Sequence, residues 1–250
     1  MKSINKSKIA VILCGGKGLR MGGLTKKIPK PLLKVHGKPI IWYTITTLLK
    51  YNFDKMIFPL GYKGEKIQKY ILLNFKKYKK KFKFVDTGKN SSISQRIHKI
   101  KKYIPDKEDF LILNSDTIFN FDLNTLIKEH AKKKQWLTLV SVDLLVKWGL
   151  IIFRKNKLIS FDRSRVVSSL KIKNNLNSFG LINSGISALN KQILTLSKEQ
   201  DFDFESIVYK KAIKLNKAGH IKLNGLWYPI DTDKDLKTIN FDGKIINNFR

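Results

Sequence analysis

Residues 8–35, KIAVILCGGKGLRMGGLTKKIPKPLLKV, decide the fold of this chain. The apolar run Ile9–Leu13 predicts a buried strand, and the glycines after it predict a loop that exposes backbone N–H groups. Cations follow the loop closely, and the prolines on either side of Lys30 restrict the backbone around that lysine. Backbone N–H groups beside fixed cations are an arrangement that binds polyphosphates. The stretch therefore predicts a phosphate-binding loop at the end of a first strand.

Strands and helices alternate from this loop to residue 142. We expect strands at Ile9–Leu13, Lys55–Pro59, Phe82–Val85, Phe110–Leu113 and Leu137–Val142, and helices at Ile40–Leu49, Glu65–Phe75, Ile93–Tyr103 and Leu123–Lys133. This alternation predicts an α/β fold, Rossmann-like, with three α/β/α layers and a mostly parallel central sheet. In such sheets a ligand lies beyond the carboxyl ends of the strands, where the glycine loop falls.

The pattern changes after residue 142. We expect short strands at Leu150–Phe153, Leu158–Phe161, Leu181–Leu189 and Ile221–Leu223, and helical segments at Lys191–Leu196, Phe204–Leu215 and Lys234–Ile239. No Gly-, Pro- or Ser-rich linker and no internal repeat divides the chain. We therefore expect a single domain that ends in a small β-rich portion.

The net charge of +31 comes from 50 Lys and Arg against 19 Asp and Glu. Nucleic-acid binding is one explanation. Lysine supplies nearly all of the excess, however, and readers of bases and phosphates usually rely on the bidentate arginine fork. The lysines also extend from end to end, so we favour compositional bias and keep nucleic-acid binding as an alternative.

Other features bound the compartment and the chemistry. No apolar run approaches the roughly 18 residues that span a bilayer, and no signal-peptide pattern opens the chain, so we expect a cytoplasmic protein. The single cysteine, Cys14, excludes an internal disulfide. Its place at a strand end, far in sequence from any histidine, favours a packed residue over a nucleophile.

Two better-known glycine loops do not fit the chain. A Walker loop needs Lys-Ser or Lys-Thr after its glycines, and neither follows here. A dinucleotide-binding loop needs a glycine where Met21 stands and an acidic residue after the second strand, where Pro59–Gly61 stand. The sequence therefore disfavours a P-loop enzyme and a nicotinamide dehydrogenase.

Two aspartates end apolar strands in the same manner. Asp116 follows the strand in FLILNSD, and Asp231 follows the aromatic segment WYPI. Asp116 could instead cap a helix. Two carboxylates beside a phosphate loop are a ligand set for Mg²⁺, which takes one or two carboxylates with phosphate oxygens and waters.

The motifs GGKGLRM, PKPLLKVHGKPII, GYKGEKI, NSDT, INSG and PIDT, in this order from about residue 8 to residue 240, resemble the sugar-1-phosphate nucleotidyltransferases. Within that superfamily, VDTGKNSSISQRI at residues 85–97 is most similar to the glucose-1-phosphate cytidylyltransferases. The resemblance implies one nucleotidyltransferase domain over residues 1–250. Its nucleotide-binding part would cover about 1–142 and its acceptor-binding part about 143–250.

The resemblance also implies an activity. A Mg²⁺-dependent enzyme would transfer a cytidylyl group from CTP to a sugar 1-phosphate and release a CDP-sugar and pyrophosphate. The favoured sugar 1-phosphate is glucose 1-phosphate. Such products feed cell-surface polysaccharides, including lipopolysaccharide, and the relatives commonly assemble as homo-oligomers. The alternatives are a guanylyl-, uridylyl- or thymidylyltransferase acting on another sugar 1-phosphate, such as a heptose 1-phosphate, and a nucleic-acid-binding protein on a degenerate transferase fold.

Site residues follow from the resemblance, position by position. Arg20 would hold the β- and γ-phosphates, Lys30 would stabilise charge on the α-phosphate, and both would be catalytic. The nucleotide site would contain Leu13, Gly15, Gly16, Gly18, Arg20, Lys30, Gly88, Ser91, Arg96 and Asp116, of which Gly88, Ser91 and Arg96 would lie near the base or its ribose. The metal would be bound by Asp116 and Asp231. The acceptor site would contain Trp148, Gly149, Arg163, Asn183, Gly185 and Glu205.

Two departures from the family pattern concern phosphate contacts. Leu19 stands where the family usually has a threonine. The string FDRSRV replaces the usual Phe-x-Glu-Lys-Pro, whose lysine binds the acceptor phosphate, so we expect Arg163 or Arg165 to take its place.

Overall fold

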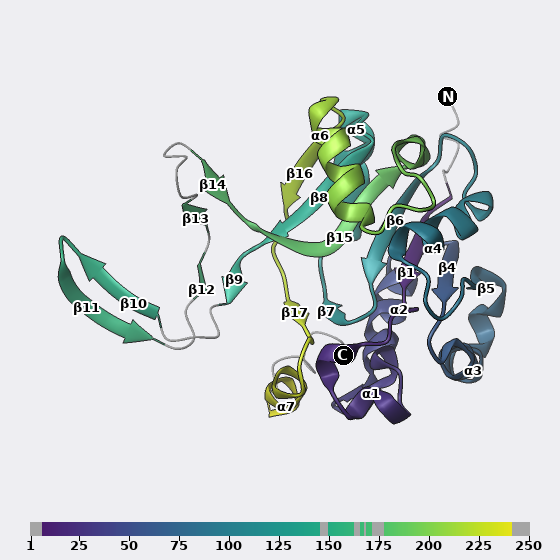
Figure 1. The fold of residues 1–250 in the computed structure, drawn as a ribbon, viewed down its shortest axis with the longest axis horizontal. Helices are drawn as coiled ribbons and strands as arrows, with labels where there is room; N and C mark the ends of the chain where they lie inside the picture. Colours follow the sequence, from purple (N-terminus) through teal and green to yellow (C-terminus); the bar gives the residue numbers. More distant parts are fainter. Residues whose placement is uncertain (1–6, 146–149, 163–165, 168, 172–177, 242–250) are drawn as a thin grey trace.

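The structure is a computed structural model that describes residues 7–145, 150–162, 166–167, 169–171 and 178–241. A seven-stranded sheet forms its centre (Figure 1), in the order β16-β8-β15-β6-β1-β4-β5. These strands are β1 (Ile9–Leu13), β4 (Lys55–Leu60), β5 (Phe82–Asp86), β6 (Asp109–Asn114), β8 (Leu137–Val142), β15 (Ile182–Asn190) and β16 (Ala218–Lys222). Only β15 runs antiparallel to its neighbours in this sheet, so the predicted mostly parallel sheet is confirmed.

Helices cover both faces of this sheet and make three layers. One face carries α2 (Ile40–Lys50), α3 (Gly64–Asn74) and α5 (Leu123–Lys133), and the other carries α4 (Ile93–Ile100), a 3₁₀-helix (Lys191–Leu196), a π-helical turn (Glu205–Tyr209) and α6 (Lys210–Lys214). The side chains of β1 alternate between the two layers, as strand geometry requires: Ala10 and Ile12 belong to one core, and Ile9 and Val11 belong to the other. The sequence thus encodes a sheet that is apolar on both sides.

Short elements follow β1 and form one end of the molecule. They are the 3₁₀-helices Leu19–Met21 and Lys30–Leu32, the helix α1 (Leu24–Lys27) and the hairpin of β2 (Lys34–Val35) and β3 (Lys38–Pro39). A two-stranded ribbon of β7 (Thr117–Phe119) and β17 (Trp227–Pro229) lies beside them, and α7 (Asp233–Phe241) follows the ribbon. Figure 1 shows α1 and α7 at the same end of the fold.

The region after β8 consists of small antiparallel pairs. These pairs join β9 (Leu144–Leu145) to β12 (Val166–Val167), β10 (Leu150–Arg154) to β11 (Lys157–Asp162), and β13 (Leu170–Lys171) to β14 (Phe179–Gly180). In Figure 1 the β10–β11 hairpin projects away from the central sheet. The division into a nucleotide part and an acceptor part stays a prediction. Within the described ranges, no helix combines the length and the apolar character needed to cross a bilayer.

Two predicted boundaries differ from the structure by three residues, and the other predicted bounds agree with it to within two. The helix expected over residues 93–103 changes at Ile100 into a 3₁₀-helix over Lys101–Tyr103, a common way for a helix to end. The strand expected near Ile221–Leu223 begins already at Ala218, because its backbone pairs in parallel with β8 from that residue on. The remaining 3₁₀-helix covers Lys76–Lys81.

Candidate active site

The carboxyl ends of β1 and β6 place the glycine loop beside Asp116. The two strands are parallel neighbours, with Leu13 opposite Asn114. Ser115 then donates from its backbone N and its Oγ to the Leu13 carbonyl oxygen, at 3.3 and 2.7 Å. The loop after β1 and the turn after β6 therefore share one edge of the sheet, as expected for a ligand site in this class of fold.

The β7–β17 ribbon brings Asp231 to the same place. The strands are antiparallel, with Thr117 opposite Pro229, and the Ile230 backbone N donates to the Asp116 carbonyl oxygen at 3.0 Å. Asp116 precedes one strand and Asp231 follows the other, so antiparallel pairing puts both at one end of the ribbon. The structure thus brings together two carboxylates that are distant in the sequence.

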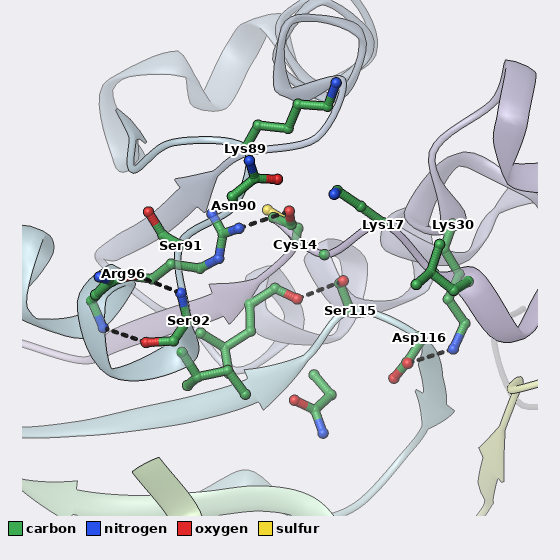
Figure 2. Close-up of a pocket in the computed structure, with 18 of the residues that line it drawn as sticks. Cys14, Lys17, Lys30, Lys89, Asn90, Ser91, Ser92, Arg96, Ser115 and Asp116 are labelled. Carbon is green, nitrogen blue, oxygen red and sulfur yellow. Dashed lines mark hydrogen bonds and ion pairs between the residues drawn. The ribbon is translucent and has the colours of Figure 1, made fainter. Parts of the chain in front are cut away.

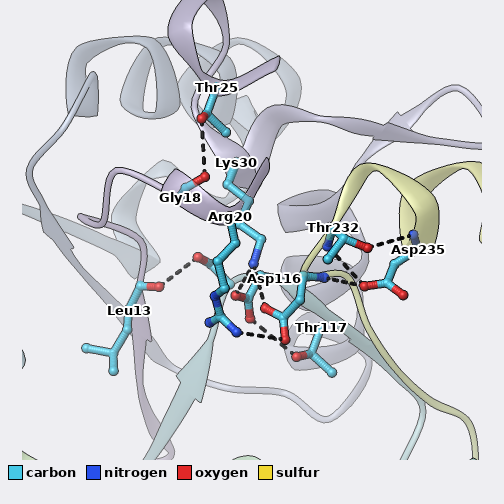
Figure 3. A network of polar contacts seen from close by, with 11 residues as sticks. Leu13, Gly18, Arg20, Thr25, Lys30, Asp116, Thr117, Thr232 and Asp235 are labelled. Carbon is cyan, nitrogen blue, oxygen red and sulfur yellow. Dashed lines mark hydrogen bonds and ion pairs between the residues drawn. The ribbon is translucent and has the colours of Figure 1, made fainter. Parts of the chain in front are cut away.

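Lys30 lies between these carboxylates, and Figure 3 shows its ammonium group directed at Asp116. Its Nζ is 2.6 Å from Asp116 Oδ2 and 3.1 Å from Asp231 Oδ1. Only 9% of the Lys30 side chain is exposed, whereas Arg20, whose NH1 is 3.4 Å from Asp231 Oδ2, is 75% exposed. One cation is therefore fixed inside the site, and the other reaches it from solvent.

Asp235 orients Asp231 and was not among the predicted site residues. Its buried carboxylate oxygen Oδ2 accepts from the backbone N of Asp231 and of Thr232, both at 3.0 Å. In return, Thr232 Oγ1 accepts from the Asp235 backbone N at 3.2 Å. This reciprocal pair is a capping box in which an acid follows a threonine by three residues at a helix start. The letters TDKD, residues 232–235, carry that signal in the sequence.

Arg96 supports the glycine loop through a hydrogen bond to its first glycine. Its buried guanidinium donates from NH2 to the Gly15 carbonyl oxygen at 3.0 Å, and from NH1 to the Leu60 carbonyl oxygen at 3.1 Å and to Thr87 Oγ1 at 2.6 Å. A Cβ at Gly15 would lie 2.2 Å from Arg96 NH1, so this close approach requires glycine. Burial lowers the pKa of Arg96, and Cys14 and Asp86 oppose that shift. The predicted contact of Arg96 with a base stays a prediction.

Cys14 is packed behind the same loop. Burial raises the pKa of its thiol to about 12, although Arg96 acts in the opposite direction. A thiol with such a pKa stays protonated near neutral pH and is a poor nucleophile. This agrees with the packing role expected from the sequence.

A pocket of about 1020 Å³ extends from Lys30 and Asp116 along the glycine loop (Figure 2). Among its lining residues are the predicted Leu13, Gly15, Gly16, Gly18, Arg20, Lys30, Ser91, Arg96 and Asp116. Gly88 is not among them. It shapes the turn before Ser91, with a φ of 93° and a backbone N that donates to Asp86 Oδ1 at 2.9 Å.

The pocket wall away from Lys30 (Figure 2) includes residues that the sequence did not predict. Lys89, Asn90, Ser92 and Gln95 lie between Gly88 and Arg96, so the motif at residues 85–97 contained their signal. Gln200, Phe202 and Asp203 come from a distant loop with no recognisable motif. That loop is attached to the start of α4, where Ser92 Oγ donates to the Asp201 carbonyl oxygen at 3.1 Å.

The predicted acceptor residues that the structure describes, Asn183, Gly185 and Glu205, are not in the lining of this pocket. Gly185 has a φ of 76°, and a Cβ there would lie 2.6 Å from Nδ2 of Asn114, which lines the pocket. Asn183 is exposed, and its Oδ1 accepts from the Gly185 backbone N at 3.3 Å. Burial, and then the nearby Asp203, raise the pKa of the Glu205 carboxyl. Trp148, Gly149, Arg163 and Arg165 lie outside the described residues.

Comparison with known proteins places the chain in a family. Residues 9–240 match the Nucleotidyl transferase family. The chain is 32% identical to a probable glucose-1-phosphate cytidylyltransferase of Bacillus subtilis, over 92% of this chain and 94% of that protein. It is also 32% identical to the bifunctional protein GlmU of Methanococcus aeolicus, over 92% of this chain but only 53% of that protein, so the chain spans about half the length of this relative.

Solved structures support the fold. A putative glucose-1-phosphate thymidylyltransferase from Bacillus anthracis, in complex with a sucrose, superposes with a TM-score of 0.72 at 18% identity, over 96% of this chain and 99% of that one. HddC from Yersinia pseudotuberculosis, complexed with GMP-PN, superposes with a TM-score of 0.67 at 22% identity, over 93% of this chain and 98% of that one. The chain belongs to the nucleotidyl transferase family, and its resemblance to the sugar-1-phosphate nucleotidyltransferases is confirmed.

Proposed function

We propose that the chain transfers a cytidylyl group from CTP to a sugar 1-phosphate and releases a CDP-sugar and pyrophosphate. Glucose 1-phosphate is the favoured acceptor. The observation that carries this proposal is the convergence of Lys30, Asp116 and Asp231 beside the glycine loop. The choice of CTP is supported by the similarity to the probable glucose-1-phosphate cytidylyltransferase of Bacillus subtilis and to a 25% identical glucose-1-phosphate cytidylyltransferase of Salmonella typhimurium. A cytoplasmic location stays a prediction.

The proposed reaction is an in-line displacement at the α-phosphorus. An oxygen of the sugar phosphate forms a bond to that phosphorus while the bond to the pyrophosphate oxygen breaks. No protein nucleophile is needed, so alignment and charge neutralisation supply the catalysis. Lys30 would stabilise the charge that grows on the α-phosphate, and its burial strengthens this effect because little water screens it. Arg20, which is exposed at the loop, would hold the departing phosphates.

A divalent metal fits the carboxylate pair. Asp116 and Asp231 both direct oxygens to one ammonium group, so their arrangement already accommodates a positive charge. Within the described residues no group of three or more His, Cys, Asp or Glu side chains forms a metal site, and Mg²⁺ beside a triphosphate needs only one or two carboxylates. When bound, the metal would neutralise phosphate charge. Asp116 and Asp231 would be its protein ligands, and Asp235 would orient the second of them.

Neutral polar groups suit the recognition of the nucleotide base. Asn90 and Ser91 line the pocket on the side away from Lys30 (Figure 2), and Gln95 is also among its lining residues. Amide and hydroxyl groups can donate to and accept from the edge of a base, so this wall is where base selectivity would arise.

A second candidate keeps the reaction and changes the base. The structural relatives include a putative thymidylyltransferase and a protein complexed with GMP-PN, and both have the same overall fold. Turnover should therefore be measured with CTP, GTP, UTP and dTTP, each against a panel of sugar 1-phosphates, by following pyrophosphate release. We expect CTP with glucose 1-phosphate to have the highest kcat/KM. A higher kcat/KM with another triphosphate would replace the cytidylyl assignment.

A further inference from the structure

The motif GYKGEKI, residues 61–67, contacts the start of the glycine loop and also the helix α1 that follows this loop. The proposed chemistry does not use the motif. At the start of the loop, the Tyr62 backbone N donates to the Gly15 carbonyl oxygen at 3.0 Å. The chains approach so closely here that a Cβ at Gly61 would lie 2.6 Å from that same oxygen. The start of the loop therefore rests on the backbone of this motif.

The side chains of the motif bind carbonyl groups of α1. Tyr62 OH donates to the Thr25 carbonyl oxygen at 3.2 Å. Lys63 Nζ donates to the carbonyl oxygens of Thr25, at 3.4 Å, and of Lys26. Lys66 Nζ donates to the Lys27 carbonyl oxygen at 3.2 Å. Carbonyls at a helix end have no partner within the helix, and lysine amines can bond to them. We call Tyr62, Lys63 and Lys66 the carbonyl clamp.

Thr25 connects the carbonyl clamp to Arg20. Its side chain is buried, and its Oγ1 lies 3.2 Å from the Gly18 carbonyl oxygen and 3.3 Å from that of Gly22. Those two glycines flank the 3₁₀-turn Leu19–Met21 that carries Arg20. A continuous series of hydrogen bonds therefore leads from the clamp, through Thr25, to both sides of the arginine.

The backbone of Lys63 is left-handed, as it is at several other lysines of the described residues. Its φ of 52° is in the left-handed region, which residues with a Cβ rarely adopt and which glycine or asparagine tolerates best. This conformation places Lys63 at the N-cap of α3, the position from which its side chain reaches the carbonyl groups of α1.

We propose that Tyr62 and Lys63 are positioning residues that act through Thr25 to hold Arg20 against the phosphates of the bound nucleoside triphosphate. This inference rests on the phosphate-binding role proposed for Arg20. It assigns the GYKGEKI motif to the alignment of the leaving group, because an exposed arginine needs a fixed backbone to hold one geometry.

Substitutions at Lys63 test the proposal through kcat and the nucleotide KM, measured separately. Lys63→Met keeps the length of the side chain and removes its donors, and we expect it to lower kcat by roughly tenfold, since small misplacements of a catalytic group are costly. Lys63→Arg keeps a cationic donor and should restore kcat to within about twofold of the unsubstituted chain. Tyr62→Phe removes one hydroxyl and should lower kcat by a smaller factor. The matched control is Lys69→Met, on the exposed side of α3, which should leave kcat unchanged.

A double substitution separates positioning from general stability. In an Arg20→Ala background, Lys63→Met should change kcat by less than about twofold, because the group that it positions is gone. An undiminished tenfold loss in that background, or no loss in the unsubstituted chain, would overturn the role of the clamp alone. If Arg20→Ala itself left turnover unchanged, the proposed phosphate role of Arg20 would fail, and the clamp proposal with it.

Discussion

Two carboxyl-bearing regions beside the pocket have opposite electrostatic surroundings. Next to the glycine loop, Asp116 and Asp231 share the ammonium group of Lys30. Beside the opposite wall, Glu205 has the carboxylate of Asp203 as a neighbour, and burial together with that neighbour raises its pKa. Opposite charges that are held together suit the binding of phosphates and metal, whereas a carboxyl that resists ionisation suits hydrogen bonding to neutral groups. In the proposed reaction, charge neutralisation and substrate recognition would therefore belong to different regions of this site.

Removal of Lys30 should have the largest effect. We expect Lys30→Ala to lower kcat by about 100- to 1000-fold, because it deletes a preorganised positive charge that acts on the transition state. It also leaves Asp116 and Asp231 without the cation that they share. The measurement is pyrophosphate release under saturating substrates, with the thermal midpoint recorded for each variant. Lys27→Ala, an exposed lysine of the same segment, is the control, and a kcat within about threefold of normal for Lys30→Ala would remove the basis of the comparison.

Substitution of either aspartate should next affect the need for metal. Asp116→Asn and Asp231→Asn should each raise the Mg²⁺ concentration for half-maximal turnover by at least about tenfold, since even the loss of a residue that only supports a metal ligand costs that much. A magnesium titration of the initial rate measures this. Asp233→Asn, which removes a partly exposed carboxylate paired with Lys237, is the matched control. An unchanged magnesium requirement in both variants would show that the carboxylate pair serves Lys30 and not a metal.

Two neighbouring glycines test how tightly the phosphate region is built. Gly15→Ala should lower the free energy of unfolding by about 1–3 kcal/mol, because the new methyl group would overlap the buried guanidinium of Arg96. Gly16→Ala is the control, since a Cβ at that position would have no atom within 4 Å other than those of Gly16 and its chain neighbours. Chemical denaturation with both variants gives the two values. Equal stabilities would mean that Arg96 can move away, and that the loop is less fixed than the hydrogen bonds indicate.

The sequence predicts the region around the glycine loop and Lys30 better than the pocket wall that contains Phe202 and Asp203. The reason is physical. Strand β1 and helix α5 have the predicted bounds, because their apolar patterns and the helix-capping Asp122 are local signals. The ribbon of β7 and β17 has only three residues in each strand, too few for a periodic pattern, yet this ribbon brings Asp231 to Asp116. The order of the family motifs predicted that Asp231 would lie near Asp116, whereas hydrophobic periodicity could not predict it. Phe202 and Asp203 reach the pocket only through long-range packing against α4, which no local signal encodes.

Glu205 should show the smallest effect, and its pH dependence tests the other half of the comparison. Its pKa is raised above the ordinary value of 4.5, so the folded state favours the protonated form. The stability that this form contributes is complete below about pH 4.5 and is lost as the pH rises through the raised pKa. Glu205→Gln stays neutral at every pH. We therefore expect its thermal midpoint to exceed that of the unsubstituted chain at pH 7 by roughly 1–3 °C, and the difference to vanish below pH 4.5. Glu199→Gln, an exposed carboxyl of the preceding loop, should show no such convergence. A lower midpoint for Glu205→Gln at pH 7 would mean that the ionised carboxylate is stabilised in the fold, and that the two regions do not differ in the way proposed.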